Sequence, residues 1–132
     1  VTTNSYITLE GRLVMGGGIA NEARDRFAGL DEILGGKINH LSIYGLLISE
    51  NWPIGLFQVK RHYKENADLS LIRYSTNMLK TWANNHQNIL VHLNFPGIGL
   101  GRLDPLDVYN VICTLPNNVN VWSNTPIPDF GS

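Results

Sequence analysis

The sequence predicts an α/β protein in which helices cover both faces of a mixed, largely parallel sheet, giving a three-layer α/β/α sandwich. Apolar runs typical of strands alternate along the chain with segments whose apolar residues recur at helical spacing. The resulting order is strand, helix, strand, strand, helix, strand, helix, strand. A length of 132 residues with 43% hydrophobic content suits a single core, so we expect residues 1–132 to form one domain.

Strands are expected where short apolar runs are bounded by turn-forming residues. These runs are residues 1–3, 42–49, 55–60, 89–93 and 119–122. The second and third runs are separated by the breaker Asn51-Trp52-Pro53. They are therefore expected either to pair as a hairpin or to lie as neighbours in the sheet.

Helices are expected where apolar side chains recur every three or four residues. The segments are residues 19–29 with a further short turn at 30–34, residues 68–84, and a segment that follows Asp104-Pro105. Asn66 or Asp68 is the expected cap of the second helix, and Asp104 is an N-cap with proline at the first helical position. The tail, residues 123–132, is expected to form a surface strap.

Charge and cysteine content exclude several classes of protein. Ten Lys and Arg against eleven Asp and Glu give a formal charge of -1, so binding to nucleic acid through bulk charge is excluded. Cys113 is the single cysteine, and no signal segment or long apolar run is present. We expect a soluble cytoplasmic protein without a membrane partner. The start at Val1 indicates processing or removal of upstream sequence.

Two glycine clusters indicate an anion-binding site. Gly16-Gly17-Gly18 and the alternating Gly97, Gly99 and Gly101 each precede an expected helix. Free N–H groups at a helix N-terminus, together with backbone that carries no Cβ, let phosphate oxygens approach closely. Two such sites at one edge of a sheet fit a diphosphate. The alternative is that the glycines only form tight turns, and both interpretations stay open.

Other phosphate, metal and hydrolase motifs fail on spacing. Gly36-Lys37 is followed by Ile38, which excludes a P-loop, and Asn21 stands where a dinucleotide fingerprint needs glycine. No Gly-x-Ser-x-Gly sequence is present. The histidines show no ligand spacing, so no metal and no cofactor are expected. His92 is interpreted as a hydrogen-bonded core residue, and Cys113 as lying on or beside the buried side of its helix.

Lys60 ends an apolar run at the edge of the sheet where a ligand is expected. Desolvation there would lower the pKa of the amine and make it a nucleophile. Alternatively, the side chain leaves the sheet edge and reaches water. Asp104 also has two interpretations, a helix N-cap and a carboxylate of the site, and one side chain can fill both roles.

Three segments resemble macrodomains, the ADP-ribose-binding fold. They are Thr2-Thr3-Asn4, Val14-Met15-Gly16-Gly17-Gly18-Ile19-Ala20 and Pro96-Gly97-Ile98-Gly99-Leu100-Gly101-Arg102-Leu103. The resemblance extends over nearly the whole chain. It is greatest to the branch of terminal ADP-ribose protein glycohydrolase and the DNA ADP-ribosyl glycohydrolase antitoxins, whose loops have the patterns Val-Met-Gly-x-Gly-Ile-Ala and Pro-x-Ile-Gly-x-Gly.

The resemblance implies a role for residues of both loops. The ligand-binding residues that it implies are Met15, Gly16, Gly17, Gly18, Ile19, Pro96, Gly97, Ile98, Gly99, Leu100, Gly101 and Arg102. Asn4 would orient the distal ribose, Lys60 would act at its C1″ atom, and Asp104 would assist proton transfer. Trp122 either stacks on the adenine or packs in the core.

The chain also departs from the family pattern. The second loop is shorter than in the antitoxins, so the match of Asp104 to a family aspartate depends on where a gap is placed. Gly17 stands where relatives often carry arginine or another side chain. The chain starts about where a central strand of the family begins, so the family's leading strand and its adenine-contacting acidic residue have no counterpart here.

The function hypothesis is a hydrolase that removes ADP-ribose from a modified protein or nucleic acid by attack at C1″. Alternatives are an ADP-ribose-1″-phosphate phosphatase, which needs the same loops but not the lysine, and a binding module without turnover. A fourth alternative is that the glycine loops are structural remnants on a scaffold with another ligand. The expected partner is ADP-ribose or an ADP-ribosylated macromolecule. The oligomeric state stays open, although an unpaired sheet edge favours a dimer.

Overall fold

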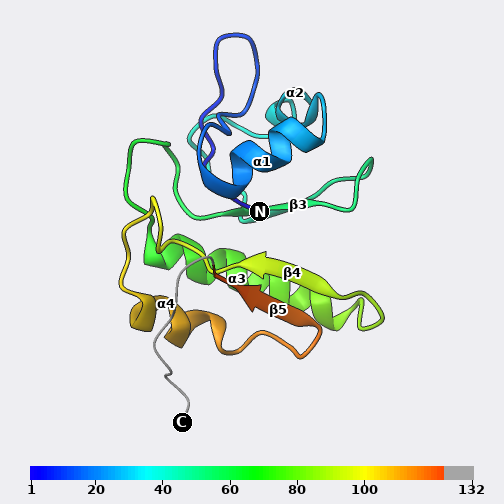
Figure 1. Ribbon diagram of the computed structural model, residues 1–132, viewed down its shortest axis with the longest axis vertical. Coiled ribbons are helices and arrows are strands. Elements are labelled where there is room, and N and C mark those ends of the chain that lie inside the picture. Colours follow the sequence, from blue (N-terminus) through cyan, green and yellow to red (C-terminus); the bar gives the residue numbers. More distant parts are fainter. Residues whose placement is uncertain (124–132) are drawn as a thin grey trace.

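Helices lie on both sides of the central strand β3 in the computed structural model, which describes residues 1–123 (Figure 1). The strands are β1 (Thr2–Thr3), β2 (Leu46–Ile48), β3 (Gly55–Gln58), β4 (Val91–Asn94) and β5 (Val119–Trp122). The helices are α1 (Gly18–Arg26), α2 (Leu30–Gly35), α3 (Leu69–Asn84) and α4 (Pro105–Ile112). Their order is the expected one. Apart from Ser123, the expected C-terminal strap lies outside the described residues.

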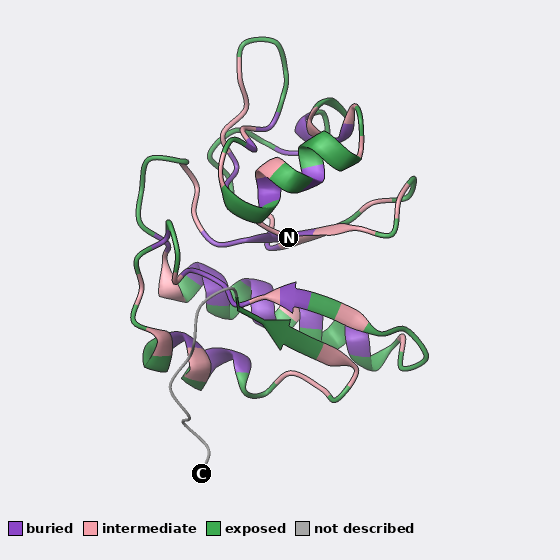
Figure 2. Cartoon of the chain, viewed as in Figure 1, coloured by how far each residue is buried: buried purple, intermediate pink, exposed green. Residues whose placement is uncertain are grey.

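Strand β3 contributes side chains to two apolar cores because successive side chains of a strand point to opposite faces. Leu56 packs in a cluster with residues of α1 and α2, such as Ala20 and Leu30. Phe57 packs in a second cluster with residues of α3, β4 and α4, such as Ile72. Figure 2 shows buried residues on both sides of this strand. The expected three-layer arrangement is therefore confirmed.

The sheet is mixed and largely parallel, as expected, but it is interrupted. Strand β3 pairs in parallel with β1 and antiparallel with β2, and β4 pairs in parallel with β5. Between β1 and β4, a side chain makes the connection. The Asn94 amide nitrogen donates to Thr2 Oγ1 (2.8 Å), and its oxygen accepts from the Thr2 N–H (3.2 Å). One side-chain amide thus links the two ladders.

The second strand is shorter than expected. Of residues 42–49, only β2 is paired. It forms an antiparallel hairpin with β3, which is one of the two arrangements expected from the sequence. Gly45 has φ +74°, a left-handed conformation that ends the extended run. The Gln58 side-chain oxygen accepts hydrogen bonds from the N–H groups of Tyr44 (2.8 Å) and Gly45 (3.1 Å). The Gln58 side chain therefore satisfies N–H groups beyond the end of the ladder, while the Gln58 N–H still donates to Gly45 O (2.7 Å).

Helix boundaries differ from the sequence expectation at one junction. The first helix ends at Arg26, and Gly29, expected as its end, instead caps α2 with φ +86°. The expected turn at 30–34 is the helix α2 itself. Asp68, rather than Asn66, caps α3, and Asp104 caps α4 as expected, each with a side-chain oxygen that accepts first-turn N–H groups. Within residues 1–123, no helix has the length and apolar character to cross a bilayer.

Two residues expected in or near the core are exposed. In β4, Leu93 packs in the core with α3 and α4, whereas His92 lies on the other, uncovered face. The expectation of a core histidine was therefore wrong, although the ring is hydrogen-bonded. Cys113 is also exposed. Trp122 is 59% exposed, which excludes core packing as its role.

We expect the Asn94→Ala variant to lower the free energy of unfolding by about 1–3 kcal/mol, because the Thr2 N–H and hydroxyl lose their partner. Denaturant unfolding measures this change. Asn120→Ala, an exposed asparagine on the neighbouring strand, is the matched control and should change the free energy by less than about 0.5 kcal/mol. Equal losses in the two variants would contradict a connecting role for Asn94.

Candidate functional site

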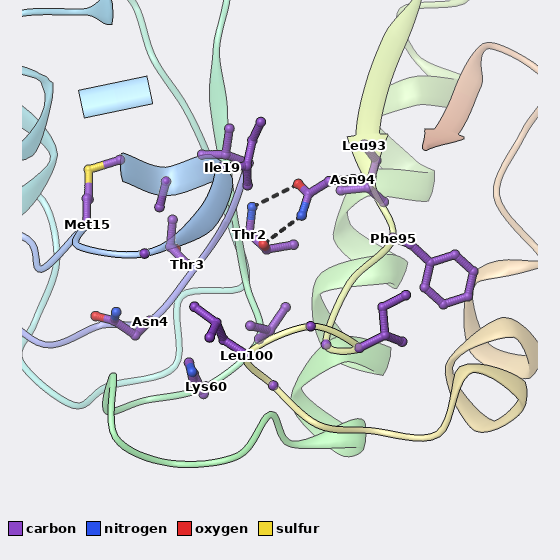
Figure 3. A pocket seen from close by; sticks show the side chains of 18 of the residues that line it. Thr2, Thr3, Asn4, Met15, Ile19, Lys60, Leu93, Asn94, Phe95 and Leu100 are labelled. Carbon is purple, nitrogen blue, oxygen red and sulfur yellow. Dashed lines mark hydrogen bonds between the residues drawn. The ribbon is translucent and has the colours of Figure 1, made fainter. Parts of the chain in front are cut away.

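The two glycine loops line one cavity of about 790 Å³ at the break between the two ladders. Figure 3 shows the side chains of Asn4, Lys60 and Leu100 gathered around this space. The expected site residues that line it are Asn4, Met15, Gly16, Gly17, Ile19, Lys60, Gly97, Ile98, Gly99, Leu100, Gly101 and Trp122. Segments from five parts of the chain therefore meet in one cleft.

The first loop presents the N-terminus of α1 to the cleft. Gly17 is the N-cap, and no side chain caps the helix. The first N–H groups of a helix lack intrahelical partners and carry the positive end of its dipole. The first turn contains no acidic residue, so no carboxylate of the helix competes for these groups. This end of the helix suits an anionic ligand.

The second loop is a tight turn held by its own backbone. Leu103 N–H donates to Gly97 O (2.8 Å), and Arg102 N–H donates to Gly99 O (3.1 Å). Across residues 1–123, no hydrogen bond uses the N–H groups of Ile98, Gly99 or Leu100. Because an unpaired backbone N–H seeks an acceptor, this loop can offer donors to a ligand.

Glycines of the two loops differ in what a side chain at each position would meet. A Cβ added at Gly101 would lie 2.7 Å from Gly97 O, and one added at Gly97, where φ is +77°, would lie 2.7 Å from Ile72 Cδ1. These two glycines are required by packing. A Cβ added at Gly16 or Gly99 would meet nothing within 4 Å, and neither residue has a positive φ. The protein's own packing leaves those two positions open, which the tight-turn interpretation does not explain.

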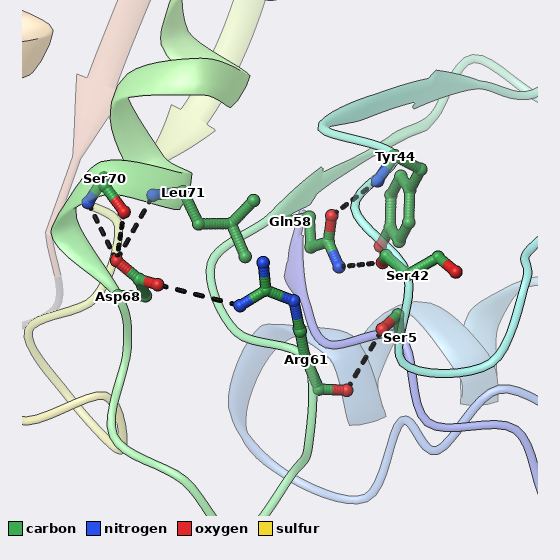
Figure 4. A network of polar contacts seen from close by, with 8 residues as sticks. All are labelled: Ser5, Ser42, Tyr44, Gln58, Arg61, Asp68, Ser70 and Leu71. Carbon is green, nitrogen blue, oxygen red and sulfur yellow. Dashed lines mark hydrogen bonds and ion pairs between the residues drawn. The ribbon is translucent and has the colours of Figure 1, made fainter.

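Lys60 follows β3 on a backbone that is fixed on both sides. Val59 O accepts a hydrogen bond from the Asp68 N–H (2.9 Å). Arg61 O accepts two from buried Ser5, one from its N–H (3.0 Å) and one from its hydroxyl (3.1 Å). Figure 4 shows Ser5 bound to Arg61, whose guanidinium in turn reaches Asp68. The base of the Lys60 side chain therefore has a defined position at the cleft.

The surroundings of Lys60 lower the pKa of its amine. Burial is the main cause that lowers the pKa of the amine below its ordinary value, and the positive charge of Arg102 lowers it further. The Glu65 carboxylate acts in the opposite direction. Lys60 Nζ also donates a hydrogen bond to the backbone oxygen of Glu65 (3.1 Å). A lysine with a lowered pKa more readily presents a lone pair.

Asn4 lines the cleft beside Lys60 and is only 7% exposed. Its side-chain nitrogen donates to Val14 O (3.1 Å), and its oxygen accepts from the Tyr6 N–H (2.8 Å). These bonds tie β1 to the segment that leads into the first glycine loop. A side-chain amide has two N–H groups and two acceptor lone pairs, so one of each is left for a ligand.

Four expected site residues do not line the cavity: Gly18, Pro96, Arg102 and Asp104. Pro96 is buried. The positive charge of Arg102 nevertheless lowers the pKa of Lys60, which does line the cavity. The Asp104 side chain accepts the Leu106 N–H (2.9 Å), so its N-cap role is the one that the geometry supports.

Sequence reasoning missed several polar or aromatic residues that line the cavity, among them Thr2, Tyr63, His92 and Asn94. The alternation of apolar and polar residues in Val91-His92-Leu93-Asn94 is the signal that would have assigned His92 and Asn94 to one face. Tyr63 comes from the loop after β3, where no periodicity applies. Its ring packs against His62 at a centroid distance of 4.5 Å.

No metal centre is found in the described part of the chain, because no three His, Cys, Asp or Glu side chains lie close enough together to hold an ion. The cavity lining is mostly backbone, apolar side chains and neutral polar groups, with Lys60 as its one ordinarily charged side chain among residues 1–123. The site thus suits a ligand that carries both negatively charged groups and apolar or hydroxyl groups.

No family model matches the sequence, and no curated protein matches it. Solved structures do. DarTG of Thermosipho africanus in complex with ADP-ribose gives a TM-score of 0.71 at 20% identity, over 97% of this chain and 38% of that one. The macrodomain of Mycobacterium tuberculosis DarG gives 0.64 at 21% identity, over 96% and 87%. The macrodomain of Thermus aquaticus DarG gives 0.63 at 19% identity, over 95% and 86%.

These similarities establish the fold. The chain has the α/β macrodomain fold, in agreement with the resemblance given by its two glycine loops. It spans nearly the full length of the two DarG macrodomains and 38% of the DarTG chain.

We expect Arg102→Gln to raise the pKa of Lys60, because a neighbouring positive charge is removed, and Glu65→Gln to lower it, because a favourable negative charge is removed. NMR titration of the lysine Cε–Hε signals measures both, with Lys60→Arg used to assign the signal. In Arg102→Gln the pKa should still lie below the ordinary lysine value, because burial is the main cause. Shifts of the same sign in both variants would contradict this description of the site.

Proposed function

We propose that this chain, on its macrodomain fold, binds ADP-ribose in the cleft and hydrolyses the bond that joins C1″ of the distal ribose to a modified macromolecule. The observation that carries the proposal is the pair of glycine loops on one cavity, in which Gly16 and Gly99 leave space that the protein does not fill. A similar structure, DarTG of Thermosipho africanus, is a complex with ADP-ribose, which supports the same ligand here.

Each part of ADP-ribose has a matching part of the cleft. The diphosphate suits the N-terminus of α1 and the N–H groups of residues 98–100. The distal ribose suits the spare amide groups of Asn4, next to Lys60. Lys60 follows β3 and Trp122 ends β5, and strands β1 and β4 lie between them. The indole is therefore separated from Lys60 across the cleft, and its exposed ring suits the adenine.

The chemistry of Lys60 depends on its protonation. As a neutral amine, Lys60 donates its lone pair to C1″ while the bond to the macromolecule breaks, and water then replaces the amine. The leaving group takes up a proton. As an ammonium, Lys60 instead stabilises the charge that develops on departure of that group. The lowered pKa of Lys60 increases the share of neutral amine relative to an ordinary lysine, and the first route needs that form.

Calorimetric titration with ADP-ribose, with AMP and ribose 5-phosphate as controls, tests the binding half of the proposal. Saturable binding to ADP-ribose well above that of the controls is expected. Absence of binding at millimolar ADP-ribose would overturn it. Incubation with ADP-ribosylated protein, ADP-ribosylated nucleic acid and ADP-ribose-1″-phosphate then separates the hydrolase from the phosphatase, and from a binding module that turns over none of them.

Lys60→Ala should abolish most of the hydrolysis and leave ADP-ribose binding within a few-fold of the parent chain, because the amine acts on C1″ rather than on the diphosphate. Rate and affinity are measured on the same preparation. On the neutral-amine route, the rate rises with pH through the pKa of Lys60, and Arg102→Gln moves that rise to higher pH. Full activity of Lys60→Ala would contradict the mechanism.

Gly16→Ala and Gly99→Ala should keep the thermal midpoint but weaken ADP-ribose binding by about tenfold, because each methyl group occupies space left for the ligand. Gly101→Ala is the contrasting variant. Its methyl group would collide with Gly97 O, so it should lower the free energy of unfolding by about 1–3 kcal/mol. Unchanged affinity in both Gly16→Ala and Gly99→Ala would show that the ligand does not approach these loops.

A further inference from the structure

His92 and Trp122 lie on one face of the β4–β5 ladder, where that face meets the cleft. Asn94 is in register with Trp122, and alternation along β4 puts His92 on the same side as Asn94. The opposite face, with Leu93, packs in the core with α3 and α4. Both His92 and Trp122 line the cavity. The two rings thus meet at the end of the site that belongs to β5.

One side-chain hydrogen bond sets the orientation of the indole. Trp122 Nε1–H donates to His92 Nδ1 at 2.9 Å, with ring centroids 5.8 Å apart and ring planes at 47°. The backbone of Trp122 is held separately, since its oxygen accepts the Phe95 N–H (2.6 Å). With 59% of the residue exposed, packing alone does not fix the ring. An unrestrained side chain loses rotamer freedom when a ligand orders it, and this loss weakens binding.

We propose that His92 is a positioning residue, which holds the Trp122 indole in the orientation that stacks on the base of the bound nucleotide. This inference rests on the proposed function and assigns a role to His92, which the ADP-ribose hypothesis did not use. Because Nδ1 is the acceptor, His92 acts in the form whose Nδ1 carries no proton. The interaction contributes to recognition of the base and leaves the diphosphate and the distal ribose untouched.

A test without ligand follows the indole N–H itself. Solvent exchange of the Trp122 Nε1–H is measured by NMR, with Trp122→Phe identifying its signal among those of the three tryptophans. His92→Leu removes the acceptor, whereas His92→Asn places a carbonyl oxygen near the position of Nδ1. We expect faster exchange in His92→Leu and near-parental exchange in His92→Asn. Equal exchange in the parent and both variants would overturn the proposal.

A test with ligand isolates the effect on the base. His92→Leu should weaken ADP-ribose binding by about threefold to tenfold, and His92→Asn should retain the parental affinity. In a Trp122→Phe background, which keeps a stacking ring without the N–H, His92→Leu should cause no further loss. Binding of ribose 5-phosphate, which has no base, should not change. The same loss in the Trp122→Phe background, or for ribose 5-phosphate, would overturn the positioning role.

Failure of the proposed function and failure of the positioning role give different results. No binding of ADP-ribose by the parent chain overturns the proposed function, and the stacking role with it. If the parent chain binds ADP-ribose but His92→Leu weakens that binding as much in the Trp122→Phe background as in the parent, the positioning role alone is overturned. Thermal midpoints confirm that the variants are folded, which is expected because both side chains are exposed.

Discussion

The contact between Asn94 and Thr2 is the constraint on which the cleft depends. A continuous ladder between β1 and β4 would keep their backbones about 4.8 Å apart along their whole length. Instead, one side-chain amide connects the two ladders, and β1 and β4 are not otherwise paired with each other in the described structure. The site forms at this break because the first glycine loop belongs to the half with β1 and the second to the half with β4. The sheet interruption and the ligand cavity are therefore one feature.

Strand β3 holds the two halves together from within. Leu56 and Phe57 belong to different cores, so a change of angle between the halves would disturb packing on both faces. Lys60 comes directly after this strand, and bonds from Ser5 and Asp68 fix the backbone around it. Lys60 is thus supported by a strand that packs in both cores, while one glycine loop leads into α1 and the other is a turn held by its own backbone.

Residue patterns were sufficient to predict local structure but not which face of a strand is covered. Apolar spacing and the capping aspartates Asp68 and Asp104 gave the order of elements, because these signals depend only on neighbours in sequence. The early end of the second expected strand depends on the Gln58 side chain, a contact with another strand that no local pattern contains. His92 was expected in the core because its strand is apolar, yet exposure is decided by which layers cover the sheet. The roles of Gly16 and Gly99 likewise needed the packing around each position.

The composition of the cavity limits which groups could carry out the acid–base steps of the proposed hydrolysis. Among the described residues that line it there is no aspartate or glutamate, and Asp104 is occupied as the cap of α4. A carboxylate in the cleft would repel the diphosphate, so its absence there is consistent with an anionic ligand. In the proposed hydrolysis, proton transfer would then have to involve water, the ligand, Lys60, or neutral side chains of the lining such as His92 and Tyr63. In the proposed hydrolysis, the protonation of Lys60 decides which role its amine takes, and its surroundings act on that pKa in both directions: burial and Arg102 lower it, and Glu65, which lies outside the cavity lining, raises it.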